Sequence, residues 1–182
     1  VQSILNDVRK NGDSAVKKYE QKFNGTKTSQ LRVSEKEIKE AQSKISNQER
    51  EAIQEMRNTL SWQESEYLKI LPSYKYNERD DYIRTAKSFT PIPSVGCYIP
   101  GGQARYPSSA AMAVIPARQA GVKRIVVVSP PGRDGKIDPL TIVAAKMCGA
   151  TEIYKVGGAQ AIGALAYGTK SIPKVDKIVG PG

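Results

Sequence analysis

Four short apolar runs, each ended by glycine or proline, constrain the fold of this chain more than any other feature. The runs are Val95–Ile99, Arg124–Val128, Glu152–Val156 and Lys177–Val179, and the segments between them have the length of helices. Runs of about five residues that alternate with helices of about ten predict parallel strands joined by helical crossovers. The runs lack apolar–polar alternation, as is typical of strands covered on both faces. The second half therefore predicts part of a doubly wound α/β domain.

The glycines at the strand ends predict a ligand site. They lie in Gly101-Gly102, Pro130-Pro131-Gly132, Gly157-Gly158 and Gly180-Pro181-Gly182. Ligands of open parallel sheets bind beyond the carboxyl ends of the strands, where glycine permits close approach and helix N–H groups attract anions. The Gly-x-Gly-x-x-Gly fingerprint of dinucleotide binding is absent. The spacing therefore leaves open both the identity of the ligand and the alternative of turn glycines without one.

Residues 1–90 read as a helical N-terminal segment with a short hairpin. Ser34 with Glu37 and Ser46 with Glu49 form capping boxes, and Asp13 is expected to cap an earlier helix. A long helix after Ser46 ends before Pro72, and the tyrosine-rich stretch 74–89 predicts a strand pair. We place the boundary near residue 90, so that residues 91–182 form an incomplete Rossmann-like part.

Two prolines bear on the helices of this second part. Pro116 lies inside the expected helix 108–120, which should either kink at Ile115 or restart at the proline. Pro139 should occupy the first position of a helix capped by Asp138. No internal repeat is apparent along the sequence.

Composition limits the classes of function. The net charge is +10, but the excess is scattered, with 11 Lys/Arg against 4 Asp/Glu in residues 91–182, and lacks the aromatic and basic interleaving of nucleic-acid binders. No apolar run is long enough to cross a membrane. Cys97 and Cys148 are too few for a disulfide framework and are expected to be buried, which favours a cytoplasmic protein.

The residues that chemistry would need are missing. The chain contains no histidine, the commonest general base and zinc ligand. The two cysteines have no companions at ligand spacing, so neither catalytic nor metal-binding residues can be named.

Three longer motifs resemble the histidinol dehydrogenase family. They are Val95-Gly-Cys-Tyr-Ile-Pro-Gly-Gly102, the Gly-Gly-Ala-Gln-Ala-Ile segment that begins at Gly157, and Lys-Val-Asp-Lys-Ile-Val-Gly-Pro-Gly at 174–182. The resemblance implies an NAD- and zinc-dependent enzyme that oxidises L-histidinol to L-histidine, acts in histidine biosynthesis and forms a homodimer.

The resemblance also implies roles for three residues of this chain. Tyr98 and Gln160 match cofactor-binding positions for NAD, and Ser108 matches a substrate-binding position, although it also suits a helix N-cap. The catalytic and zinc-binding residues of the family follow the Gly-Pro-Gly motif. We therefore expect this chain to be the front of a longer protein and to be inactive alone. The alternatives are a non-catalytic nucleotide- or anion-binding module and, less favoured by the residues, a basic nucleic-acid adaptor.

Overall fold

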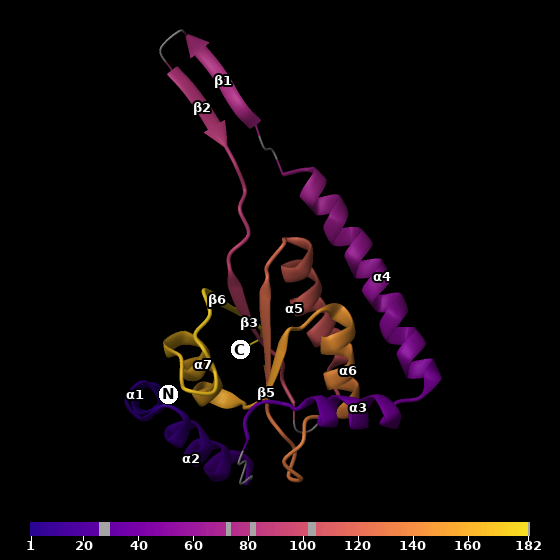
Figure 1. Cartoon of the computed structure of the whole chain (residues 1–182), viewed down its shortest axis with the longest axis vertical. Helices are drawn as coiled ribbons and strands as arrows, with labels where there is room; N and C mark the ends of the chain where they lie inside the picture. Colours follow the sequence, from indigo (N-terminus) through magenta and orange to yellow (C-terminus); the bar gives the residue numbers. More distant parts are fainter. Residues whose placement is uncertain (26–29, 72–73, 81–82, 102–104, 182) are drawn as a thin grey trace.

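Among the residues that the structure describes, four parallel strands form a sheet with helices on both faces (Figure 1). The computed structural model describes residues 1–25, 30–71, 74–80, 83–101 and 105–181, so Gly102 and Gly182 of the predicted strand ends lie outside it. The helices are α1 (Gln2–Asn11), α2 (Asp13–Asn24), α3 (Glu35–Lys44), α4 (Asn47–Lys69), α5 (Pro107–Gln119), α6 (Pro139–Cys148) and α7 (Gly158–Tyr167). The strands are β1 (Tyr74–Asp80), β2 (Ile83–Lys87), β3 (Ser94–Tyr98), β4 (Arg124–Ser129), β5 (Glu152–Lys155) and β6 (Lys177–Val179).

The sheet confirms the predicted fold class. Its order is β5-β4-β3-β6, and all three pairings are parallel. At the centre, Gly96 of β3 lies opposite Val126 of β4 on one side and Ile178 of β6 on the other. The chain moves outward from β3 through β4 to β5 and then returns to the other side of β3. This reversal is the topological switch of a doubly wound fold.

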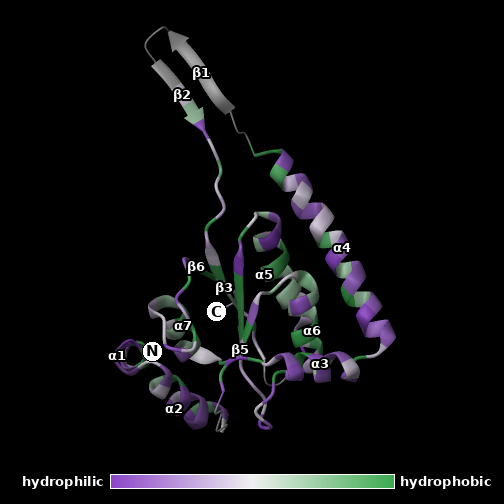
Figure 2. Cartoon of the chain, viewed as in Figure 1, coloured by the Kyte–Doolittle hydropathy of each residue, from purple (hydrophilic) through white to green (hydrophobic). Residues whose placement is uncertain are grey.

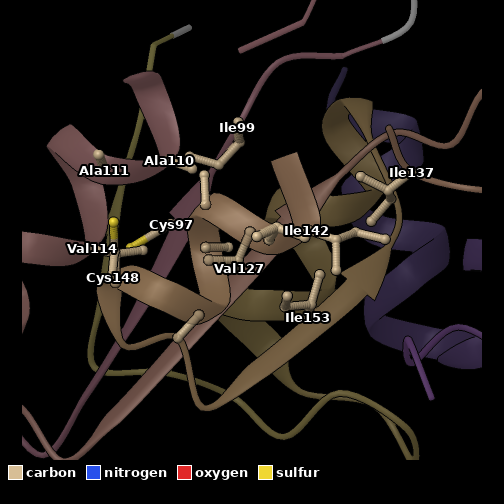
Figure 3. Close-up of a cluster of buried hydrophobic side chains, with 14 of the residues drawn as sticks. Cys97, Ile99, Ala110, Ala111, Val114, Val127, Ile137, Ile142, Cys148 and Ile153 are labelled. Carbon is tan, nitrogen blue, oxygen red and sulfur yellow. The ribbon is translucent and has the colours of Figure 1, made fainter. Parts of the chain in front are cut away.

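The uninterrupted apolar runs are explained by a core on each face of the sheet. In β4, Ile125 and Val127 pack with α3, α5 and α6, whereas Val126 and Val128 pack with α1, α2 and α7. Figure 2 shows most of β4 in the colour of apolar residues beside largely apolar helices α5 and α6, whereas the N-terminal helices α2, α3 and α4 are mostly hydrophilic. Figure 3 shows the first core, where strand side chains such as Val127 meet Val114 and Ile142 from α5 and α6.

The N-terminal helices complete both cores. Helices α1 and α2 pack against α7, whereas α3 and α4 pack against α5 and α6. Between them, the backbone of residues 31–33 bonds to β5, with the Lys155 N–H donating to the Leu31 carbonyl at 2.7 Å. The division of the chain into 1–90 and 91–182 stays a prediction.

The helix starts confirm the two capping boxes but correct two other assignments. Ser34 and Ser46 each accept from the backbone N–H three residues on, and Asp138 caps α6 with Pro139 first in the helix. Asp13 is not a cap: Gly12 holds that position, and the Asp13 carboxylate instead accepts from the N–H and hydroxyl of Ser171, at 3.2 and 2.6 Å. The Asp13 carboxylate is therefore occupied by Ser171, which lies 158 residues further along the chain.

Helix α5 begins at Pro107 with Tyr106 as its N-cap, so Ser108 does not cap it. Proline at the first helical position has no N–H to satisfy, which favours this earlier start. The helix continues through Pro116 without a second start, and the carbonyl of Pro116 accepts from the N–H of Ala120 at 2.9 Å.

Helix α4 and the hairpin β1–β2 extend beyond the sheet (Figure 1). The hairpin is antiparallel, which confirms the predicted strand pair, although residues 72–73 and 81–82 lie outside the described ranges. Ile53 near the start of α4 is buried, but Tyr67 near its end is 56% exposed. The apolar stripe of α4 therefore covers the core only along its first half. In the described part of the chain, no helix is both long and apolar enough to cross a bilayer.

Candidate functional site

The carboxyl ends of β3 and β6 border a cavity at the topological switch. This cavity, of about 300 Å³, lies where β3 and β6 end and α7 begins. Doubly wound folds bind their ligands at this place because the loops that leave neighbouring strands there run to opposite faces of the sheet. The residues that line it are Tyr98, Gly158, Ile162, Ile178, Val179, Gly180 and Pro181.

Tyr98 connects the end of β3 to the start of α7 at this cavity. Its hydroxyl accepts a hydrogen bond from the N–H of Gly158, at 3.2 Å, so the end of β3 is joined to the start of α7. Tyr98 is partly buried, and Gly158 is exposed with a positive φ of 58°. A phenol in this position offers a ring face and a hydroxyl to a bound molecule.

Gly180 fits the cavity because it has no side chain. Its φ is 144°, which disfavours any residue with a Cβ atom. A Cβ at this position would contact the backbone oxygen of Tyr98 and lie 2.9 Å from the Tyr98 Cβ. Glycine therefore lets the end of β6 approach the end of β3 closely at the cavity.

Gln160 lies in the first turn of α7, but its side chain is buried with only 1% exposed. Its Nε2 donates to Glu20 Oε1 of α2 at 2.8 Å, and the same oxygen accepts from the N–H of Gly157 at 2.9 Å. The Gln160 Oε1 atom has no hydrogen-bond partner among the described residues. A buried acceptor without a protein partner is uncommon, so this oxygen is available to a donor from outside the described residues.

Glu20 was missed by the sequence reasoning, although a signal existed. It is four residues after Val16 and therefore on the same face of α2, and both side chains are fully buried. A carboxylate within an apolar stripe is costly to bury unless it accepts hydrogen bonds, so it marks a polar partner elsewhere in the fold.

Ser108 lies on a different part of the same edge. It is exposed in the first turn of α5, the helix that follows β3. It does not line the cavity that holds Tyr98, so the structure brings Tyr98 and the start of α7 together but not Ser108. The loop residues 102–104 before α5 lie outside the described ranges.

A second cavity at this edge, of about 350 Å³, lies between the end of β4 and the start of α6. Its lining is charged, and two of its three cations are paired: Arg105 binds Glu49 at 3.0 Å and Asp138 at 3.1 Å, and Lys136 lies 3.5 Å from Glu40. This mutual neutralisation does not favour an anionic ligand.

The Glu37–Lys155 pair lies beside the second cavity, at the end of β5. Lys155 Nζ contacts Glu37 Oε1 at 2.6 Å, and the lysine side chain is 9% exposed. Burial works to raise the pKa of Glu37, but hydrogen bonds from Lys155 and Ser34 outweigh it and hold that pKa below its ordinary value. The pair ties α3 to the sheet.

The described residues do not fit a zinc ion. They contain no group of three or more histidine, cysteine, aspartate or glutamate side chains placed to hold a metal. Burial raises the pKa of the Cys97 thiol to about 12 and that of Cys148 to about 11, which disfavours the thiolate that metals and nucleophilic chemistry require.

Comparisons with known proteins agree on one family. The family model described as histidinol dehydrogenase matches residues 1–182. Histidinol dehydrogenase of Bacillus cereus is 49% identical over all of this chain and 42% of its own length, and that of Methanosarcina barkeri is 44% identical over the same shares. The crystal structure of histidinol dehydrogenase from Elizabethkingia anophelis superimposes with a TM-score of 0.93 at 34% identity, over 100% of this chain and 41% of that one. The chain thus spans about two fifths of the length of the relatives it matches.

Proposed function

The chain belongs to the histidinol dehydrogenase family, and from that premise we propose that it forms the NAD-binding part of an enzyme that oxidises L-histidinol to L-histidine. The cavity between the ends of β3 and β6 carries this proposal, because it lies at the switch point where doubly wound folds bind nucleotides. The cofactor supplies a hydride acceptor when it is bound.

Residues that line the cavity, together with Gln160 beside Gly158, fit such a cofactor. The Tyr98 ring and hydroxyl can contact a planar base or a ribose, and the unpartnered Oε1 of Gln160 can accept from a hydroxyl or an amide. The glycines at 158 and 180 let the backbone approach the ligand. These groups bind and orient; none of them is placed to take a proton from an alcohol.

We assign acid–base chemistry and zinc binding to the part of the relatives that this chain does not span. The absence of histidine from the sequence and of a ligand group among the described residues supports this assignment. We assign a supporting role in substrate binding to Ser108, at the exposed start of α5, and we expect the longer protein to be a homodimer.

A variant at Gln160 tests the cofactor site. In the full-length protein, Gln160→Leu should weaken NAD binding by about 1–3 kcal/mol, the cost of leaving a buried polar group unpaired. NAD titration by calorimetry measures the change, and thermal unfolding measures stability. Gln119→Leu is the matched control, since Gln119 Nε2 donates to the Ser61 carbonyl at 3.1 Å, away from the cavity. A lowered midpoint with unchanged NAD affinity would remove Gln160 from the site.

One assay distinguishes the proposed enzyme from the alternative function, a nucleotide-binding module without catalysis. The full-length protein should form NADH from NAD when L-histidinol is added. Binding of NAD without any turnover by the full-length protein would favour the module instead.

A further inference from the structure

Glu20 is a fully buried carboxylate that reaches from α2 to the start of α7. Its Oε1 accepts from the N–H of Gly157 at 2.9 Å and from Nε2 of Gln160 at 2.8 Å, and its Oε2 accepts from Nδ2 of Asn24 at 2.7 Å. None of its surface is exposed. A carboxylate in such a place costs free energy unless its oxygens are occupied, so these contacts stabilise its burial.

This contact determines which way the Gln160 amide faces. An ionised carboxylate only accepts hydrogen bonds, so the NH₂ group of Gln160 must point to Glu20 and the Oε1 atom must point away. That atom is left without a partner among the described residues. It lies 2.9 Å from the place where Gly158 would carry a Cβ, and Gly158 lines the switch-point cavity with Tyr98.

We propose that Glu20 is a positioning residue for the cofactor: it holds the Gln160 amide so that Oε1 accepts a hydrogen bond from a donor group of NAD. The inference rests on the function proposed above. Without Glu20, the amide of Gln160 could turn over and present NH₂ to the ligand, and the N–H of Gly157, the N-cap of α7, would lose its acceptor.

A double-mutant cycle in the full-length protein tests this. Glu20→Leu and Gln160→Leu should each weaken NAD binding about 10-fold, the effect of losing about one hydrogen bond. The double variant should bind NAD no more weakly than Gln160→Leu alone, because Glu20 acts through Gln160. Glu20→Gln keeps an acceptor oxygen at the same place and should restore NAD affinity to within about threefold of the native protein.

Val16→Ala is the matched control. Val16 is buried on the same face of α2 but has no polar side-chain atom that could hold the Gln160 amide, so its truncation should lower the thermal midpoint while NAD affinity is kept. A purely structural Glu20 would behave like Val16, and its effect on NAD would be absent or would add to that of Gln160→Leu. Either result overturns the inference.

The outcomes also separate the inference from the proposed function. Loss of NAD affinity in Gln160→Leu but not in Glu20→Leu overturns only the role of Glu20. Unchanged affinity in both variants overturns the cofactor role of Gln160 as well.

Should Glu20→Leu not fold, a crystal structure of the native full-length protein with NAD decides: Oε1 of Gln160 should lie within about 3.2 Å of an N–H or O–H of the cofactor, with Glu20 still bound to Nε2. No cofactor atom at that distance overturns the inference.

An analogue identifies the donor. Replacement of the nicotinamide carboxamide by an acetyl group removes its NH₂. The effect of Gln160→Leu should vanish with this analogue if the carboxamide is the donor, and should persist in full if the donor is a ribose hydroxyl.

Discussion

Gly157→Ala should destabilise the protein by bringing two loops of the ligand edge into collision. A Cβ at position 157 would lie 2.5 Å from Cβ and 3.1 Å from Cα of Pro130, in the loop that follows β4. Carbon atoms in contact prefer about 3.5–4.0 Å, so the two loops must separate by about 1 Å. Pro130 is a rigid ring attached to the backbone and cannot rotate away, as a flexible side chain could.

The expected cost is that of overpacking, about 1–3 kcal/mol. The backbone of Gly157 has φ −127° and ψ −173°, which alanine adopts without strain, so the cost is steric alone. With an m-value of about 2 kcal/mol per molar urea, a loss of about 2 kcal/mol moves the unfolding midpoint down by about 1 M. Circular dichroism in a urea series measures this shift.

Gly25→Ala is the control for this prediction. A Cβ at Gly25 would have no atom within 4 Å, but its φ of +68° strains alanine by about 1 kcal/mol. The two variants separate steric from conformational cost, and only Gly157→Ala should also weaken NAD binding, because it moves the start of α7. A Gly157→Ala protein with the native urea midpoint would refute the close approach of the two loops.

Three further predictions concern the site and its surroundings. Tyr98→Phe should weaken NAD binding by about 0.5–1.5 kcal/mol in a calorimetric titration, because the Gly158 N–H loses its acceptor; equal affinity would place the hydroxyl outside the site. Glu37→Gln should lower the thermal midpoint by more at pH 7 than at pH 3: the folded pKa of Glu37 is below the ordinary value of 4.5, so its stabilisation is present in full above that value and decreases as pH falls towards and through the folded pKa. A midpoint difference that is constant between pH 7 and pH 3 would contradict this sign. The 182-residue chain, supplied with NAD, histidinol and zinc, should form no NADH, and metal-dependent turnover that co-purifies with it would reveal a site that its residues do not indicate.

Local sequence determined the helices and strands, and it predicts the edge at which a ligand should bind. Uninterrupted β-branched runs such as Ile125–Val128 require cover on both faces, which implied parallel strands with helical crossovers. The capping boxes at Ser34 and Ser46 were read directly, because all their partners lie within three residues. Glycine at the strand ends predicts the ligand edge in the same way, because the turn that follows a strand depends on residues next to each other in the sequence. The family motifs then directed attention to Tyr98.

Only the tertiary structure decided what depends on partners far apart in the sequence. Asp13 satisfies every local rule for a helix cap, but Ser171 takes its carboxylate across the fold. The position of Glu20 on the apolar face of α2 indicates a buried carboxylate, but only the packing of α2 on α7 brings it to Gln160, 140 residues away in the chain. The placement of β6 beside β3 creates the switch-point cavity, and strand order is a property of the whole sheet that no single run encodes. Local propensities determine the helices and strands, whereas contacts between buried polar groups far apart in the sequence determine the candidate site.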